Sequence, residues 1–346
     1  MINRSLEIIS INKYTELDYL FDNQPEGWIG SDVCHSIDLK NNRILFLFGD
    51  TIIGKTHKNE RSKDFKMINN AIGLMNSSIK EPKKMDFFWE TEKEPKSFFK
   101  QPKEMIGDFI WPTNGIVLKD GLYIFCMAVN STPDFSIDID GTIVARIKNY
   151  FENPNDWDIE YWDFEFNKGI IHSSVYPQKD YLYFFGAKKN VFENNMVIAK
   201  MKLKDLSNHA PSKSLKFYIG GGHWSNNFNR AKPMFYPGNS ESNIYYCKRN
   251  NNFITTTYIP KNNKIYLLWS KKLTGPWSEP QYIYTIPEAK QDFKVVSYAI
   301  RIHTWASDAT ESLIISYATN EYEGMDNLFT KEGYNIYRPY FIQVRI

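Results

Sequence analysis

One arrangement of hydrophobic and polar positions recurs along the chain: a stretch that alternates, a short polar turn, and then a dense apolar stretch. Alternation with a period of two indicates a half-buried β-strand, and a short apolar run rich in β-branched and aromatic residues indicates a buried one. The first copy covers residues 32–48 and turns at Lys40-Asn41-Asn42. Long amphipathic helical patterns are nearly absent, so the sequence predicts an all-β protein built from hairpins.

The same hairpin pattern occurs four more times, and an additional strand candidate follows three of these copies. Each hairpin is expected to belong to a four-stranded sheet, and five such sheets around an axis form a five-bladed β-propeller with long loops on one face. The turn of the last hairpin is expected around Ser307-Asp308-Ala309. The four hairpins cover residues 109–127, 170–187, 241–259 and 295–318, and the additional strands cover residues 141–147, 196–203 and 264–270.

Both ends of the chain carry strand patterns, at residues 6–14 and 334–346. We expect the N-terminal strand to pair with the C-terminal strands and so to close the ring of sheets. Residues 1–346 would then form a single propeller domain, which is long enough to bury a sizeable core. Residues 80–103, rich in Lys, Glu and Pro, are expected to be an inserted loop.

The charge balance gives no electrostatic ground for a nucleic-acid or membrane partner. Lys and Arg number 42 against 40 Asp and Glu, a formal net charge of +2. No apolar run is long enough to cross a membrane, and the first residues lack the apolar region of a secretory signal. We expect a monomer without nucleic-acid or membrane partners. The sequence leaves three alternatives for its compartment: the protein is cytoplasmic, it is exported by a non-classical route, or the sequence is numbered after processing.

Three cysteines, Cys34, Cys126 and Cys247, each fall within a predicted strand. An odd number cannot pair completely within one chain, and buried thiols are ordinary core residues. Asp138 and Asp140 resemble part of a calcium loop, but Asp-Gly between strands is a hairpin signal first. No residues occur at the spacing typical of a metal site, so we expect no metal or cofactor. The one alternative left open is a structural calcium ion in the central channel.

Two carboxylates stand at the outer ends of the first hairpin, Asp32 before the first strand and Asp50 after the second. Because the strands are antiparallel, the start of one lies beside the end of the other, and the two acids are expected to meet at one rim. A buried acid pair is costly unless it is hydrogen-bonded or functional. The pair is therefore either catalytic, or Asp50 caps a turn and Asp32 is a solvated strand end.

In a propeller the innermost strands begin near the axis, so residues at these starts converge, subject to the register of each strand. Two or three facing carboxyl groups are the requirement of glycoside hydrolysis, in which one acid protonates the leaving group and another activates water or attacks the sugar. The candidate catalytic residues are Asp32, Asp50 and Glu241. The candidate substrate-binding residues are Trp28, Trp111, His172, Tyr298, Arg301 and His303.

Within this set the tryptophans would stack on sugar rings, while Arg301 and His303 would bond hydroxyl groups. Simpler alternatives stay open for several members. Glu241 follows a Pro-Gly-Asn-Ser stretch and is otherwise a loop acid paired with a surface lysine. His172 is otherwise a hydrogen-bonded strand histidine, and Trp111 otherwise serves packing alone.

With these residues in hand, the chain resembles a bacterial and phage domain family long described as of unknown function and since linked to endo-D-arabinanase activity. The stretches that carry the resemblance are Trp28-Ile29-Gly30-Ser31-Asp32, Leu47-Phe48-Gly49-Asp50-Thr51, Glu241-Ser242, Ser297-Tyr298-Ala299 with His303, and Tyr337-Arg338-Pro339-Tyr340-Phe341. The architecture is similar to that of five-bladed arabinanases, xylosidases and levansucrases. The resemblance implies this fold and a glycosidase site with acids at Asp32 and Asp50, and it supports Glu241 less firmly.

The chain departs from that family at Val33, where a glycine is common, and at Thr304, where a proline is common. Both positions lie at the rim of the expected site, so the departures bear on the identity of the substrate more than on the fold. We therefore expect a glycoside hydrolase of polysaccharides or oligosaccharides, with arabinofuranose-containing chains as candidates. Asp32 would be the base or nucleophile, and Glu241 would be the acid. Asp50 would orient the sugar or set the pKa of the acid.

Two other functions stay open. The first is a non-catalytic propeller that binds glycan or protein through the same funnel. The second is a sugar transferase or phosphorylase, which needs a basic phosphate pocket for which Arg230 and Lys232 are the only sequence hint. The sequence does not distinguish inverting from retaining hydrolysis, because the separation of the carboxyl groups decides it.

Overall fold

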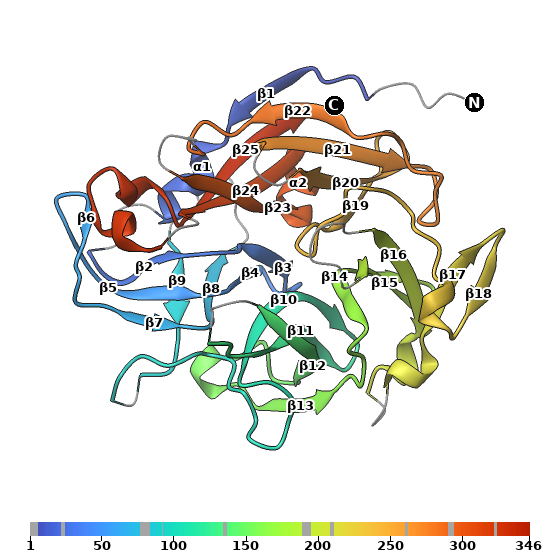
Figure 1. Ribbon diagram of the computed structural model, residues 1–346, viewed down its shortest axis with the longest axis horizontal. Helices are drawn as coiled ribbons and strands as arrows, with labels where there is room; N and C mark the ends of the chain where they lie inside the picture. The colour runs from blue at the N-terminus through green and yellow to red at the C-terminus, as the bar shows by residue number, and fades with distance from the viewer. Residues whose placement is uncertain are drawn as a thin grey trace. The chain divides into compact units, whose positions relative to one another are not determined.

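The computed structural model (Figure 1) confirms the all-β class. In the part of the chain that it describes, the strands form six sheets, and both α-helices, α1 (Thr15–Asp18) and α2 (Thr304–Thr310), are short. Two compact units are present: unit 1 is Met1–Phe99, Tyr258–Tyr266 and Gln281–Ile346, and unit 2 is Lys100–Thr257 and Leu267–Pro280. The described residues are 6–21, 25–76, 84–91, 93–133, 137–188, 195–207, 211–259, 262–289, 294–321 and 324–346.

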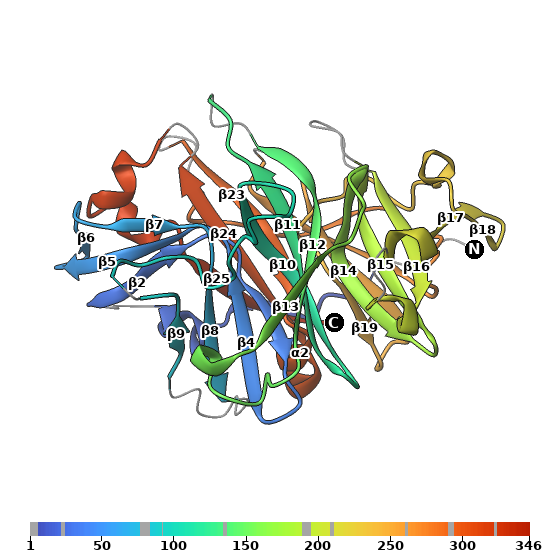
Figure 2. The same cartoon turned by 90° about the horizontal axis from the view of Figure 1, so that it is seen from below.

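The first predicted hairpin is confirmed in unit 1. Its sheet has the order β3-β4-β8-β9, and Figure 2 shows β4, β8 and β9 side by side. In the hairpin, His35 lies opposite Leu47. The first strand begins at His35 rather than at Asp32, because Val33 has a φ of 57°, which no extended strand allows. The bounds are β3 (His35–Asp38), β4 (Arg43–Phe48), β8 (Ala71–Asn76) and β9 (Asp86–Phe88).

The residues that flank this hairpin build a second sheet, which the sequence pattern did not predict. Its path is β2-β5-β6, and β7 also pairs with β5. Ser31 at the end of β2 lies opposite Thr51 at the start of β5, so the chain passes between the two sheets at Asp32 and again at Asp50. The bounds are β2 (Glu26–Ser31), β5 (Thr51–His57), β6 (Glu60–Arg61) and β7 (Lys66–Ile68).

The third sheet of unit 1 joins the two ends of the chain in the order β1-β25-β24-β23 (Figure 1). Ser10 lies opposite Arg345 and Lys13 opposite Ile342, within the range of 6–14 that the sequence assigned to an N-terminal strand. That these sheets close one ring in a single domain stays a prediction. The bounds are β1 (Ser10–Lys13), β23 (Val295–Ile302), β24 (Leu313–Glu321) and β25 (Pro339–Arg345).

The expected turn around Ser307-Asp308-Ala309 is wrong, because these residues lie in α2 between β23 and β24. Trp305 and Ala306 are buried in the core of unit 1, and a helical turn directs both side chains inward. The helix ends at Glu311, whose φ of 52° is the left-handed conformation common after a helix.

An aromatic cluster fills the core of unit 1. Trp28 stacks on Phe87 with a centroid separation of 4.8 Å and an interplanar angle of 10°. Phe21 packs on Phe341 at 5.7 Å and on Phe48 at 6.0 Å. Such side chains bury large apolar areas, which is the main stabilising contribution of a core.

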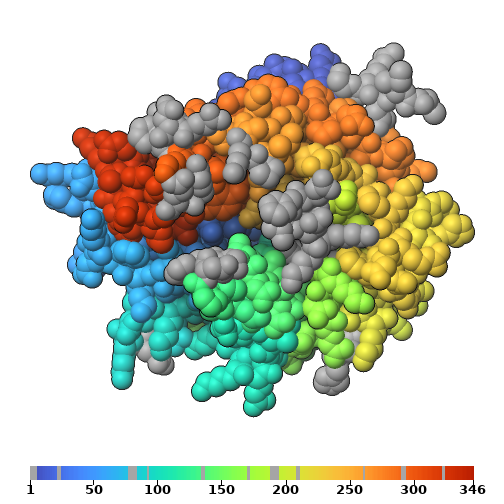
Figure 3. Space-filling model, viewed as in Figure 1, coloured from blue at the N-terminus to red at the C-terminus, as the bar shows by residue number. Residues whose placement is uncertain are grey.

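Arg61 on β6 fixes the C-terminal segment of 326–337 to this core. All five N–H groups of its guanidinium donate to backbone carbonyl oxygens, at distances of 2.7–3.3 Å. Figure 3 shows C-terminal residues of unit 1, in red, in contact with residues of its N-terminal part, in blue. Burial lowers the pKa of Arg61 to about 10, which leaves the group protonated at neutral pH. The acceptors are the carbonyl groups of Ile29, Leu328, Gly333, Tyr334 and Ile336.

Unit 2 contains the second predicted hairpin, which turns at Lys119 and Asp120 as expected. Its sheet has the order β10-β11-β12-β13. Asp138 and Asp140 lie within β12, so both interpretations of this stretch, a hairpin turn at Asp140-Gly141 and a calcium loop, are wrong. The bounds are β10 (Phe109–Leu118), β11 (Gly121–Asn130), β12 (Asp138–Ile147) and β13 (Ile159–Asp163).

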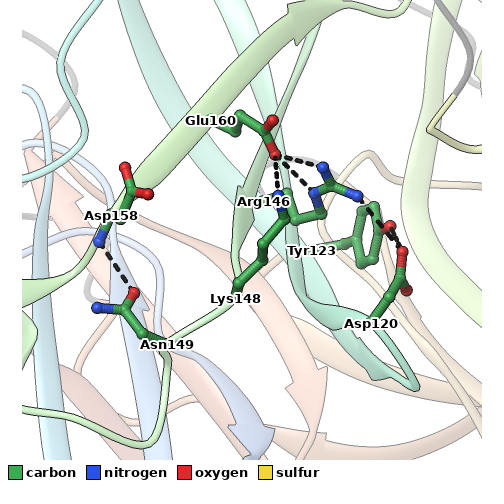
Figure 4. Close-up of polar contacts among 7 residues, drawn as sticks. All are labelled: Asp120, Tyr123, Arg146, Lys148, Asn149, Asp158 and Glu160. Carbon is green, nitrogen blue, oxygen red and sulfur yellow. Dashed lines mark hydrogen bonds and ion pairs between the residues drawn. The ribbon is translucent and has the colours of Figure 1, made fainter.

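A charged network crosses the outer strands of this sheet (Figure 4). Arg146 lies directly opposite Glu160, and its Nε donates to Glu160 Oε2 at 2.8 Å. The same guanidinium lies 3.4 Å from Asp120 Oδ2, which also accepts from Tyr123 Oη at 2.6 Å. Because both carboxylates are about half exposed, solvent screens these pairs, and they contribute more to the register of the strands than to stability.

The third hairpin, 170–187, is confirmed within a sheet of order β14-β15-β16-β17-β18. The fourth lies in the sheet β19-β20-β21-β22, where the additional strand predicted at 264–270 has those bounds. The bounds are β14 (Gly169–Gln178), β15 (Tyr181–Lys188), β16 (Met196–Lys202), β17 (Lys216–Gly220), β18 (His223–Ser225), β19 (Ile244–Cys247), β20 (Asn252–Tyr258), β21 (Lys264–Ser270) and β22 (Gln281–Thr285).

The predicted strand start at Glu241 is wrong, since β19 begins at Ile244. The side-chain oxygen of Asn239 accepts the backbone N–H groups of Glu241 at 2.9 Å and Ser242 at 2.6 Å, which holds this stretch in a turn.

Short 3-10 helices connect several of the strands. They are η1 (Tyr19–Phe21), η2 (Pro154–Asp156), η3 (Leu203–Asp205), η4 (Pro211–Ser214), η5 (Phe228–Arg230), η7 (Asp326–Phe329) and η8 (Gly333–Asn335). All three cysteines are buried and free, as expected. Over the described ranges, no helix combines the length and apolar character needed to cross a bilayer.

We expect Arg61→Lys to lower the free energy of unfolding by about 3 kcal/mol, because an ammonium group has three donors and leaves at least two buried carbonyl groups unsatisfied. Urea denaturation monitored by tryptophan fluorescence measures this. The exposed Arg249→Lys is the matched control and should change the value by less than about 0.5 kcal/mol. Equal effects of the two substitutions would contradict the assigned role of Arg61.

Candidate functional site

The junction between the first two sheets of unit 1 brings Asp32 and Asp50 side by side. The backbone N–H of Asp32 donates to the carbonyl of Asp50 at 3.1 Å, and Gly49 N–H donates to the carbonyl of Asp32 at 3.1 Å. Both aspartates are half-buried. The rim at which the sequence expected the two acids to meet is therefore present, and their positions are fixed by main-chain bonds.

Gly49 provides the space for one of these carboxylates. A Cβ atom at this position would lie 2.2 Å from Asp32 Oδ1, a distance that no real contact allows. The carboxylate of Asp32 thus lies directly over the main chain that leads into Asp50. Only glycine permits this close approach.

Tyr337, two residues before the start of β25, contacts this junction from the C-terminal segment. Its hydroxyl donates to the carbonyl of Asp50 at 3.0 Å, and its own carbonyl accepts from Ser31 N–H at 2.9 Å. Burial and the nearby carboxylates of Asp32 and Asp50 raise the pKa of Tyr337 well above its usual value. The phenol is therefore a permanent hydrogen-bond donor beside the acid pair.

Several residues of unit 1 adopt left-handed backbone conformations, and three of them lie at the strands that carry the candidate residues. They are Val33 with a φ of 57°, Ala299 with 53° and Tyr337 with 64°. A β-branched or bulky aromatic residue pays a steric penalty in this region, of the order of 1–3 kcal/mol. Val33 and Tyr337 flank the acid pair, and Ala299 lies where the pairing of β23 shifts between Tyr298 and Arg301. Such strain is characteristic of functional sites.

Behind the junction, Arg301 and His35 form a buried pair. An Arg301 Nη1–H group donates to His35 Nδ1, and both residues are at most 5% exposed. Because guanidinium has no acceptor, His35 Nδ1 must be the acceptor, which places the imidazole proton on Nε2. The pair therefore holds the beginning of β3 against β23.

A second buried chain runs from Trp305 through Ser36 to His303. Trp305 Nε1 donates to Ser36 Oγ at 2.9 Å, and Ser36 Oγ lies 2.7 Å from His303 Nδ1. His303 also packs against Phe46 and Phe341. Burial, together with the charge of Arg301, lowers the pKa of His303 to about 3, so the imidazole is neutral at physiological pH.

Three of the predicted substrate-binding residues of unit 1 are structural. Trp28 is 2% exposed and stacks within the aromatic core, so it cannot offer a face to a sugar. Arg301 and His303 are each 1% exposed and bond to protein groups. The assignment of these three side chains to direct substrate contact is therefore wrong, because burial removes the surface a ligand needs. Tyr298, on β23, is half-buried, and its role stays a prediction.

Among the candidates in unit 2, His172 is also structural. It is fully buried, its Nδ1 lies 2.5 Å from Thr113 Oγ1, and its ring stacks on Phe125. The hydrogen-bonded strand histidine that the sequence left open is therefore the correct alternative. Trp111 and Glu241 are half-buried and keep surface for a ligand, and their roles stay predictions.

Sequence reasoning missed the groups that position the acids. Gly49 lies within a stretch that carried the family resemblance, but nothing local indicated that a carboxylate covers it. Tyr337 lies in another stretch that carried the resemblance, but it is 287 positions from Asp50, and nothing local indicated that it bonds there. Arg61 belongs to no motif that the sequence singled out. In the described ranges, no three His, Cys, Asp or Glu residues lie close enough together to hold a metal ion.

The model of a family described as a domain of unknown function (DUF5005) matches residues 14–345. The chain belongs to this family. No curated protein matches the sequence.

Two solved structures share the fold of this family member. A Bacteroides ovatus protein, provisionally assigned as a hydrolase, superposes with a TM-score of 0.77 and 17% identity over 96% of this chain and 90% of that one. A family 117 glycoside hydrolase of the marine bacterium Zobellia galactanivorans superposes with a TM-score of 0.53 and 9% identity over 97% and 89%. The all-β fold therefore resembles that of propeller glycoside hydrolases.

We expect Gly49→Ala to displace the Asp32 carboxylate, because the added methyl group would occupy its position. A crystal structure of the variant measures the displacement. Gly54→Ala, on β5, is the matched control, since its nearest contacts are at 3.1 Å or more and need only slight adjustment. An unmoved Asp32 carboxylate in the first variant would contradict the assigned role of Gly49.

The neutral His303 predicts acid sensitivity. Its pKa is about 3 in the folded protein against 6.5 for the ordinary group, so below pH 6.5 the unfolded chain binds one more proton. The free energy of unfolding should then fall by up to about 1.4 kcal/mol per pH unit as the pH drops from 6.5 toward 3. Urea denaturation at several pH values should give a shallower slope for His303→Asn, and an unchanged slope for the exposed control His223→Asn.

Proposed function

We propose that this protein is a glycoside hydrolase that acts on a polysaccharide or oligosaccharide through Asp32 and Asp50. The observation that carries the proposal is the pairing of these two half-buried acids at a strained junction, in a fold like that of a family 117 glycoside hydrolase. Glycoside hydrolysis is the chemistry that most often requires two neighbouring carboxyl groups.

The surroundings of the two acids favour different roles. Asp32 is proposed as the base or nucleophile, and its carboxylate lies over Gly49, where no side chain separates it from the main chain that leads to Asp50. Asp50 is proposed as the orienting carboxylate, and the bonds that Asp32 N–H and Tyr337 Oη donate to its main-chain carbonyl support this role by holding its backbone in place. Glu241 is proposed as the proton donor on the family resemblance alone.

We further propose that five of the six sheets are the blades of a five-bladed propeller. Each of these five sheets contains one of the hairpins predicted from the sequence. The pairing of β1 with β25 supports closure between the first and last blades. The remaining sheet, β2-β5-β6 with β7, is an extension of the first blade and carries Arg61. An arabinofuranose-containing substrate is supported by the sequence resemblance only.

We expect Asp32→Asn and Asp50→Asn each to reduce cleavage at least 100-fold, because an amide neither attacks nor accepts the transferred proton. Release of reducing sugars from arabinan, arabinogalactan and capsule-type polysaccharides measures this. The control is Asp38→Asn, at the opposite end of the same hairpin, where the side chain caps Lys40 N–H at 2.8 Å. Glu241→Gln tests the proton donor in the same assay.

Cleavage at wild-type rate by both variants would remove the aspartates from the mechanism. Binding of a polysaccharide without cleavage by the parent protein would favour the alternative, a non-catalytic glycan-binding propeller. The anomeric form of the first product, followed by NMR, would separate inverting from retaining hydrolysis.

A further inference from the structure

A second concave site lies in unit 1 beside the segment that Arg61 holds in place. It is a cavity of about 500 Å³, formed by the loop before β23 and the loop between β24 and β25. This volume is within the range of roughly 300–1,000 Å³ that is usual for small-molecule sites. Asp32 and Asp50 do not line it, so the cavity is additional to the acid pair.

The lining combines hydrogen-bonding groups with a small apolar wall. Glu332 and Asn335 present exposed polar side chains, and Pro287, Val295 and Ile336 provide apolar surface. No described residue of the lining is basic, which disfavours phosphorylated or carboxylated ligands. A mixture of acceptors, an amide and aliphatic surface suits a neutral ring compound that carries many hydroxyl groups.

Glu288 lines the same cavity, and its charge is already compensated. Its Oε1 lies 2.9 Å from Lys13 Nζ, and its Oε2 accepts from the buried Tyr317 hydroxyl at 2.7 Å. The carboxylate is therefore held rigidly and can accept hydrogen bonds without requiring a cationic ligand. This arrangement favours a neutral ligand over an amine.

The other wall of the cavity is preformed. Thr330 Oγ1 donates to the Asn327 carbonyl at 2.8 Å and accepts from Gly333 N–H at 3.1 Å. Arg61 binds the carbonyl groups of Gly333 and Ile336 from behind. Because Ile336 directly precedes Tyr337, this rigid wall continues into the residue that bonds the carbonyl of Asp50.

We infer that this cavity is a binding subsite for a neutral saccharide unit. The inference extends the proposed hydrolase function: a sugar bound against 327–336 would contact the same segment that positions Tyr337 at the acid pair. Binding there would secure one part of a long glycan while another part reaches the acids. The subsite should accordingly affect KM for polysaccharides more than kcat.

Calorimetric titration of the Asp32→Asn protein tests the inference, with oligosaccharides prepared from arabinan and arabinogalactan as probes. Asn335→Trp, added to this background, should fill the cavity and weaken binding at least tenfold. Lys331→Trp places the same bulk on an exposed neighbour that does not line the cavity, and it should change binding by less than twofold. Soaking crystals of the Asp32→Asn protein with the same oligosaccharides, where density should fill the cavity, provides a measurement independent of any cavity variant.

Glu332→Gln separates a neutral ligand from a cationic one. A neutral saccharide should bind this variant within about threefold of the parent. A loss above tenfold, or stronger binding of spermidine than of any saccharide, would overturn the inference in favour of a cation site.

The remaining outcomes distinguish this subsite from the hydrolase proposal. Equal binding by Asn335→Trp and Lys331→Trp, or no saccharide density in the cavity, overturns the subsite whatever happens to cleavage. Loss of binding in Asn335→Trp alone, in a protein whose wild type cleaves nothing, supports the subsite and overturns the hydrolase.

Discussion

Five backbone carbonyl groups converge on the guanidinium of Arg61, and the geometry of the candidate site depends on this contact. The described part of the loop between β24 and β25, residues 324–338, contains only the short helices η7 and η8, so many of its carbonyl groups need an outside donor. All five N–H groups of Arg61 donate to carbonyl groups, four of them in this loop. The loop then holds Tyr337, in a strained conformation, against the carbonyl of Asp50. A buried cation satisfied only by carbonyl dipoles in this way converts an irregular segment into a rigid support.

The acid pair illustrates how strain and hydrogen bonding are combined at one place. Val33 leaves the extended region so that the chain can turn from β2 into β3, and Gly49 has no side chain so that Asp32 can lie above it. Each local irregularity would be costly alone. The main-chain bonds between Asp32 and Asp50 and the phenol of Tyr337 hold the irregular backbone in a single arrangement. The energetic cost of the junction is therefore met by the surrounding sheets.

The sequence predicted the hairpins well because period-two alternation and turn residues are local signals, as at residues 109–127. It also predicted that the main chains at Asp32 and Asp50 lie side by side, which follows from antiparallel pairing alone. It failed for Trp28, Arg301, His172 and His303, because polar or aromatic residues at strand starts look alike whether they face a ligand or a core. The prediction was also wrong at α2, because this seven-residue helix between two strands is stabilised by the burial of Trp305.

The pairing of β1 with β25 has a consequence for how the molecule is made. Residues 10–13 leave the ribosome more than three hundred positions before their partners at 342–345. Until then the sheet of β23 and β24 lacks two of its four strands, and its exposed edge is available to other chains. Correct maturation of this sheet therefore depends on the synthesis of β25, and a chain interrupted before that strand would be a substrate for chaperones or proteases.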